Sequence, residues 1–230
     1  MVVPYASFIN ALTAAGFSGV TGGKDDGVFS LFRHVLGISA DDGLPWHTGE
    51  PDTDPWEWRM RVLNERNDIA YAKVFYRKAG YITREWYPYF LTARRVGQAF
   101  EDAYQAGTAG RMEKRLYDTL QCHPRLPVHD IKRIAGIKKE DAARFDRALT
   151  ELQMKLYITM CGGERKVSQA GAAYGWYSTV FCLTEDFWPP EVWKEAAAMT
   201  PTQAFEALSR RVVALHPQAD LRKLARFITG

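Results

Sequence analysis

The sequence predicts a mainly α-helical α+β fold: tandem winged-helix (helix-turn-helix) modules with small β-hairpins and a C-terminal helical segment. Apolar residues recur at helical spacing along most of the 230 residues, and runs rich in β-branched and aromatic residues come in pairs. Between residues 110 and 185, three short helices precede two strands joined by a basic turn. This order of elements is typical of a winged helix.

Residues 1–95 are predicted to form a first winged-helix-like module. Helical spacing of apolar residues predicts its three helices at 5–15, 28–36 and 56–65. A strand at 70–76 is expected to pair with Tyr81 and Ile82 across a turn at 78–80. Thr83 is the expected N-cap of a further helix over 84–95.

Residues 96–188 are predicted to form a second winged-helix module with a basic recognition helix. Its helices are expected at 96–106, 111–122, 128–135 and 139–155, with a turn at Gly136 before the last one. Its hairpin is expected as a strand at 156–161, a turn at 162–166, the rest of the wing at 167–176 and a second strand at 177–184.

Residues 189–230 are predicted to form a helical C-terminal segment. Three helices are expected, at 189–199, 200–215 and 220–228. Proline suits the first turn of a helix, and Pro190 and Pro201 occupy that place in the first two.

The predicted recognition helix has one apolar face and one basic face. At 100° per residue from Glu140, one buried stripe contains Ala142, Phe145, Leu149 and Leu152. Arg144 and Arg147 then lie on the opposite face. Lysines at the helix start and cations in the wing complete the predicted nucleic-acid-binding set: Lys138, Lys139, Arg144, Arg147, Arg165 and Lys166.

Positive charge is concentrated in the same part of the chain. Residues 110–166 hold 13 lysines and arginines against 8 acidic residues, whereas the rest of the chain holds 17 against 19. Such a local excess is expected of a nucleic-acid-binding module, and double-stranded DNA is the partner we predict. In an alternative interpretation, Glu140 pairs with Arg144 and Arg147 with Glu151, so that the charges only stabilise a solvated helix or bind a protein.

Other classes of site find little support in the sequence. Cys122, His123 and His129 fit no zinc spacing, and no phosphate loop, dinucleotide fingerprint or nucleophile elbow is present, so we expect neither metal nor cofactor. No apolar run approaches the ~20 residues of a membrane span. The N-terminus lacks the pattern of a signal peptide, and three cysteines form no disulfide framework, so a cytoplasmic protein is expected.

A cluster of aromatic residues follows the wing. Trp176, Tyr177, Glu185 and Trp188 lie close together in the sequence and suit a pocket for a flipped or stacked base. Core packing is the alternative interpretation, and it is the more common role of such residues.

Three segments resemble the AlkZ/YcaQ-type proteins, which are tandem winged-helix DNA glycosylases. Residues 71–90 (YAKVFYRKAGYITREWYPYF) resemble the end of their first module, and residues 136–163 resemble their second. Residues 202–230 resemble the opening of a third module, which would here be truncated. The resemblance is nearest to AlkZ-related proteins of unassigned activity, and it implies a DNA-binding protein linked to DNA repair.

The resemblance fails at the catalytic motif. The glycosylases carry Gln-x-Gln or Gln-x-Asp shortly after the first helix to position the hydrolytic water, whereas residues 16–26 contain no glutamine. The sequence therefore predicts a duplex-DNA-binding protein without an assigned catalytic residue. Two alternatives are an active glycosylase on alkylated or crosslinked DNA that uses Asp25 or Asp26 as the base, and a protein-interaction scaffold or transcriptional regulator.

Overall fold

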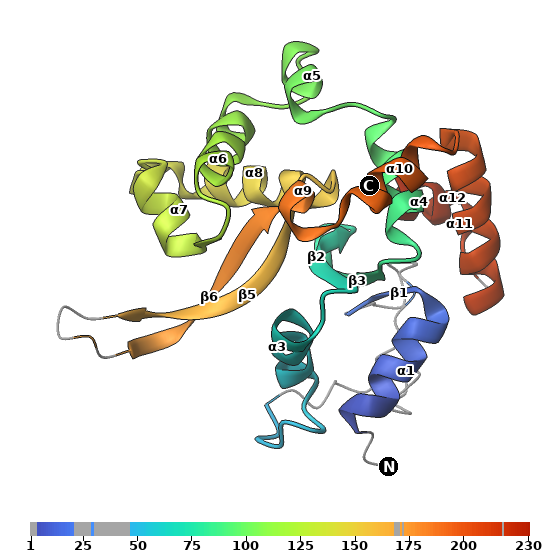
Figure 1. Ribbon diagram of the computed structural model, residues 1–230, viewed down its shortest axis with the longest axis horizontal. Helices are drawn as coiled ribbons and strands as arrows, with labels where there is room; N and C mark the ends of the chain where they lie inside the picture. The colour runs from blue at the N-terminus through green and yellow to red at the C-terminus, as the bar shows by residue number, and fades with distance from the viewer. Residues whose placement is uncertain (1–3, 21–28, 30–46, 168–170, 172, 218) are drawn as a thin grey trace.

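The computed structural model describes residues 4–20, 29, 47–167, 171, 173–217 and 219–230 (Figure 1). Within these residues the protein is an α+β fold, as predicted, around a six-stranded sheet with the order β1-β3-β2-β5-β6-β4. Every pairing in this sheet is antiparallel. The strands are β1 (Phe17–Gly19), β2 (Ile69–Phe75), β3 (Lys78–Thr83), β4 (Leu126–Pro127), β5 (Ile158–Val167) and β6 (Ala173–Leu183).

Helices flank both faces of this sheet. In the first half of the chain they are α1 (Tyr5–Ala15), α3 (Pro55–Glu65), α4 (Tyr87–Arg95) and α5 (Phe100–Gln105). The middle of the chain forms α6 (Arg111–Cys122), α7 (Val128–Ile134), the 3-10 turn η1 (Lys139–Asp141) and α8 (Ala142–Met154). The last helices are α9 (Thr184–Phe187), α10 (Pro190–Ala197), α11 (Pro201–Leu215) and α12 (Leu221–Thr229).

The sheet consists of two similar halves joined at one seam. In each half a short strand pairs with the second strand of a hairpin: β1 with β3, and β4 with β6. The halves meet where β2 pairs with β5 at Tyr71 and Met160. Helices cross this seam, because α3 packs on β5 as well as β2 and α8 packs on β2 as well as β5.

Gln153 of α8 fixes this crossing. Its side chain is almost fully buried, and Oε1 accepts a hydrogen bond of 2.9 Å from the backbone N–H of Lys73 in β2. Its Nε2 donates to the Leu149 carbonyl at 2.8 Å. A buried amide with both ends satisfied contributes to stability, so Gln153 holds the second half of the chain against the first.

Two hydrophobic cores lie on opposite faces of β2 and β3. Tyr71 and Tyr81 point into the core formed with α1, α3, α6 and α8. Ala70 and Ile82 point into the core formed with α4 and α10–α12. The C-terminal helices therefore share a core with the first segment, as the stacking of Phe227 on Phe75 at 4.3 Å shows. The predicted segment boundaries after residues 95 and 188 stay predictions.

The β2–β3 hairpin differs from the sequence prediction at its turn. The turn is Tyr76–Arg77, and both residues have left-handed φ angles, 48° and 63°. Residues 78–80, the predicted turn, belong to β3. Two left-handed residues match the twist of the flanking strands, so a two-residue turn forms despite its composition.

The helix starts around residues 83–100 were also predicted wrongly. Thr83 does not cap a helix but ends β3 in a buried position, and α4 begins only at Tyr87 after a turn. The helix predicted at 96–106 is only α5, because Val96 and Gly97 have φ angles of 50° and 75° that end α4. The predicted helix at 28–36 lies outside the described residues, apart from Phe29.

The β5–β6 hairpin is longer than predicted. Residues 162–166, predicted as its turn, continue β5, and their pairing with β6 contains two irregularities. Figure 1 shows the hairpin extending beyond the body of the protein, on the side where α7 and α8 lie. β1, β4 and α9, of three, two and four residues, had no counterpart in the sequence prediction.

Candidate nucleic-acid interface

The helices α7 and α8, with the 3-10 turn η1 between them, form the helical part of the candidate interface. The turn contains Gly136, with a left-handed φ of 58°, and the N–H of Ile137 donates to the Lys132 carbonyl at 2.8 Å. Ile131 of α7 and Phe145 of α8 are fully buried in the same core. This packing fixes the direction in which the outer face of α8 points.

The inner face of α8 is largely as predicted. Phe145, Leu149 and Leu152 are buried, and Ala148 joins them. Ala142, which was predicted to be buried, is exposed. The prediction assumed an α-helical rotation of 100° per residue from Glu140. Residues 139–141 instead form a 3-10 turn with a different rotation per residue, so the predicted direction of the Ala142 side chain is wrong.

The outer face of α8 presents two arginines. The side chain of Arg144 is 80% exposed, and its Nη1 lies 3.6 Å from Asp141 Oδ1. Arg147 is exposed, and no acidic side chain in the described part of the chain forms an ion pair with it. The guanidinium group of Arg147 is therefore available to a ligand outside the protein, and that of Arg144 is paired with Asp141 but remains largely open to solvent.

The intrahelical pairs considered as an alternative do not form. Glu151 pairs with Arg77 from the β2–β3 turn instead of with Arg147. Arg144 lies near Asp141 rather than Glu140, whose carboxylate is 4.0 Å from Lys138 Nζ. Among the described residues, neither arginine of α8 forms an ion pair with an acidic residue four positions away on this helix.

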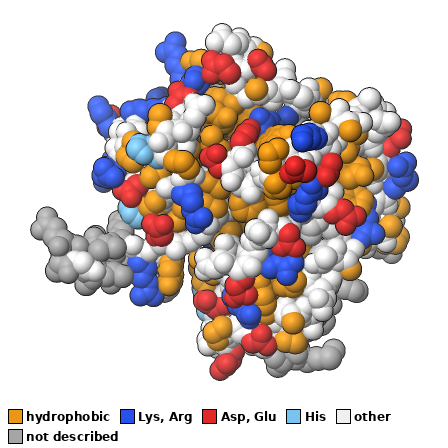
Figure 2. Space-filling view, in the orientation of Figure 1, with side chains coloured by type: hydrophobic (Ala, Val, Ile, Leu, Met, Phe, Trp, Pro, Cys, Tyr) orange, Lys and Arg blue, Asp and Glu red, His pale blue; other side chains and the backbone are white. Residues whose placement is uncertain are grey.

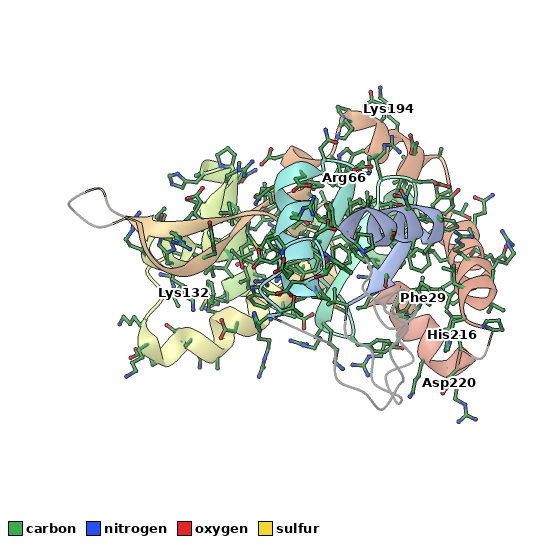
Figure 3. All side chains as sticks on the ribbon, turned by 90° about the horizontal axis from the view of Figure 1, so that it is seen from below. Phe29, Arg66, Lys132, Lys194, His216 and Asp220 are labelled. Atoms are coloured by element: carbon green, nitrogen blue, oxygen red, sulfur yellow. The ribbon has the colours of Figure 1, made fainter. Side chains whose placement is uncertain are left out.

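Lysines surround the start of α8. The side chain of Lys138 is 74% exposed, and Lys139 in η1 is exposed as well. Lys132 of α7, which sequence reasoning left out, lies with its Nζ 4.7 Å from the centre of the Phe145 ring and 3.9 Å from Asp146. Figure 3 places Lys132 beside α8, at the opposite end of the molecule from His216 and Asp220.

The β5–β6 hairpin carries the two remaining predicted cations, and the structure describes the side chain of one of them, Arg165. Arg165 of β5 is exposed, with its guanidinium carbon 4.8 Å from the centre of the Tyr177 ring in β6. Lys166 pairs through its backbone with Tyr174. Figure 2 shows lysine and arginine side chains gathered over α6 and α7 next to the hairpin, with single acidic side chains among them.

A comparison with known families identifies the chain. A family model described as "AlkZ related" matches residues 2–229. The chain belongs to the AlkZ-related family. The resemblance inferred from the sequence is thereby confirmed, and membership relates the protein to DNA-repair glycosylases. No curated protein and no solved structure matched the chain.

The residues of the aromatic cluster that was predicted after the wing have different surroundings in the AlkZ-related protein. Trp188 is buried against Tyr87, with ring centres 4.9 Å apart, so core packing is its role. Glu185 accepts hydrogen bonds from Arg95 at 3.0 Å. Tyr177, by contrast, stands 58% exposed on the hairpin.

The cysteines of the AlkZ-related protein are free thiols, and its described histidines do not join them in a group that could hold a metal ion. In the described ranges, no three His, Cys, Asp or Glu side chains are grouped so that they could hold a metal ion. Cys161 and Cys182 are buried free thiols on adjacent strands. The hydrogen bond between these thiols, together with burial, raises the pKa of Cys182, so this thiol stays protonated.

The helices of the AlkZ-related protein are amphipathic rather than apolar all round. Of the helices that the structure describes, none combines the length and the hydropathy needed to cross a bilayer.

Proposed function

We propose that this AlkZ-related protein binds double-stranded DNA through the outer face of α8 and the β5–β6 hairpin, in a role linked to DNA repair. The observation that carries the proposal is the outward placement of Arg144 and Arg147, with Arg147 free of acidic partners among the described residues. Guanidinium groups bind phosphate oxygens and guanine edges with two parallel hydrogen bonds.

The order of elements supports a winged-helix interpretation of this interface. α6, β4, α7 and α8 precede the β5–β6 hairpin, and β4 pairs with β6 to complete a small sheet. In winged helices the last helix before the hairpin enters the major groove, and the hairpin contacts the flanking backbone. We assign these two roles to α8 and to Arg165 with Lys166.

Among the described residues, the first half of the sheet has a similar order with one helix between the short strand and the hairpin. α1, β1 and α3 precede the β2–β3 hairpin, and β1 pairs with β3 as β4 does with β6. We therefore interpret the chain as two winged-helix modules whose sheets are joined at β2 and β5. Lys138 and Lys139 precede α8, where the positive end of the helix dipole adds to their attraction for phosphate.

Removing both arginines is expected to abolish most of the DNA affinity. For Arg144→Ala with Arg147→Ala, we expect the dissociation constant for a short duplex to rise at least about 30-fold, from about 1 kcal/mol per lost phosphate or base contact. Fluorescence anisotropy with a labelled duplex measures this dissociation constant.

The matched control removes two positive charges from a surface that lies away from α8. Arg210 and Arg222 are exposed arginines of α11 and α12, which lie away from α7 and α8 in Figure 1. Arg210→Ala with Arg222→Ala is expected to change the dissociation constant less than about threefold through long-range electrostatics alone. Equal effects of the two double variants would contradict the assignment of the interface to α8.

Base release is the second candidate activity, and family membership is what favours it. Asp25 and Asp26, the carboxylates considered as the base, lie outside the described residues, and residues 16–26 contain no glutamine. We expect no free base to be released from alkylated duplex DNA under conditions in which the protein binds it. Chromatography of released bases tests this, and release that is lost in Asp25→Asn with Asp26→Asn would establish the glycosylase instead.

A further inference from the structure

A cleft lies between the two halves of the molecule, where α3 faces the β5–β6 hairpin. One wall is α3, and the other is the outer part of the β5–β6 hairpin, so neither half forms it alone. Its volume is about 770 Å³. That volume falls within the range of about 300–1,000 Å³ typical of small-molecule sites.

Each wall of this cleft carries an aromatic ring with an arginine against it. On α3 the guanidinium carbon of Arg59 lies 3.4 Å from the centre of the Trp56 ring. On the hairpin the guanidinium carbon of Arg165 lies 4.8 Å from the centre of the Tyr177 ring. All four side chains line the cleft. Aromatic rings and arginines along a groove are the combination with which proteins stack unpaired bases.

Tyr177 is exposed although a tyrosine ring gains free energy from burial. Its 58% exposure places it among the few large apolar side chains that the described residues leave open to solvent. A Cβ at Gly163, the neighbouring position on β5, would lie 2.5 Å from Met60 Cε of α3 and 3.5 Å from Tyr177 Cδ1. The glycine therefore lets the hairpin approach α3 closely at the base of the cleft, which sets the separation of the two walls.

The polar groups of the cleft favour a ligand with acceptor atoms. Arg59 contacts Tyr71, but its buried Nε–H has no acceptor among the described side chains and backbone. Glu65 is occupied by Arg61, whose Nε donates to it at 2.9 Å. The ion pair of Arg61 and Glu65 has no net charge. The two positive charges of Arg59 and Arg165 therefore exceed the one remaining negative charge of the cleft, that of Glu57.

We propose that this cleft binds an unpaired nucleobase of the DNA, stacked on the exposed ring of Tyr177 and hydrogen-bonded by the arginines. The proposal rests on the proposed function, because the base belongs to DNA held by α8. A paired base in a duplex has both faces covered by its neighbours, and only an unpaired base offers a face for stacking. The ligand class is therefore duplex DNA that contains a bulged, mismatched or otherwise unpaired nucleotide.

Two duplexes test the cleft: one fully paired, and one identical except for a single bulged 2-aminopurine. We expect the wild-type protein to bind the bulged duplex about 10-fold more tightly and to quench the 2-aminopurine fluorescence through stacking. Tyr177→Ala is expected to lose both the preference and the quenching, so that the ratio of its dissociation constants for the paired and bulged duplexes falls to about 1. Tyr177→Phe, which keeps the ring, is expected to retain both.

The outcomes separate the cleft from the duplex interface. Arg144→Ala with Arg147→Ala is expected to weaken binding of both duplexes by the same factor and to leave the preference intact. A wild-type protein that binds both duplexes equally, or a Tyr177→Ala variant that keeps preference and quenching, refutes the cleft proposal alone. A wild-type protein that binds neither duplex refutes the proposed function and the cleft proposal with it.

Discussion

Replacing the partly buried Arg94 with leucine is expected to lower the free energy of unfolding by about 3–5 kcal/mol, from about 1–3 kcal/mol for each of three carbonyls that loses its donor. Arg94 of α4 donates to three carbonyls: Nη1 to Met154 at 2.8 Å, Nη2 to Phe227 at 2.9 Å and Nε to Ile228 at 2.8 Å. These carbonyls end α8 and α12, so one side chain caps two helices and joins the three parts of the chain.

Burial lowers the pKa of Arg94 to about 9, which still leaves it charged at neutral pH. Leucine fills part of the space but leaves the three carbonyls without donors. Urea unfolding monitored by circular dichroism measures the loss. The control is Arg210→Leu, in which an arginine with a 74% exposed side chain, 3.9 Å from Glu206, is removed, and we expect a change below about 1 kcal/mol. A loss for Arg94→Leu as small as that of the control would contradict the capping role.

Replacing Gly16 with alanine is expected to cost about 2–4 kcal/mol, the sum of backbone strain and overpacking. Gly16 joins α1 to β1 with a φ of 94°, a conformation that side chains with a Cβ rarely adopt. An added Cβ would lie 2.2 Å from Cδ1 of Trp86, whose ring packs edge-on against Phe17 with ring centres 5.7 Å apart. The indole therefore has to move, and the contact with the buried ring is lost.

Gly97→Ala provides the matched control for Gly16→Ala. Gly97 also has a left-handed φ, 75°, but nothing lies within 4 Å of its added Cβ. Its substitution is expected to cost about 1 kcal/mol from backbone strain alone. Thermal unfolding of both variants gives the difference, which reports the clash with Trp86. Equal losses in the two variants would show that the clash does not contribute.

Helices with a clear apolar stripe and a defined end were predictable from the sequence. The predicted bounds of α1 and α6 agree with the structure because apolar residues recur at helical spacing and Gly16 or the following prolines stop the pattern. β1 and β4, with three and two residues, are too short to show any periodicity. The pairing of β2 with β5 depends on tertiary packing, which no local pattern encodes.

The candidate site was predictable only where it depends on one helix. The 3.6-residue period placed Arg144 and Arg147 on the outer face of α8, where they are found. The partner of Glu151 is Arg77, far away in the sequence, so the pair with Arg147 that was considered as an alternative does not form. The sequence suggested Tyr177 for a stacked base, but together with its sequence neighbours. The cleft instead combines Tyr177 with residues of α3 from the other half of the chain, which no local pattern indicates.

The salt dependence of duplex binding tests the interface on α8 most directly. Each phosphate contact contributes about 0.9 to the slope of the logarithm of the binding constant against the logarithm of salt concentration. If both arginines contact phosphates, Arg144→Ala with Arg147→Ala reduces the steepness of that slope by about 1.8, whereas Arg210→Ala with Arg222→Ala leaves it unchanged. A double variant of α8 with the same affinity and the same slope as the wild-type protein would contradict the account.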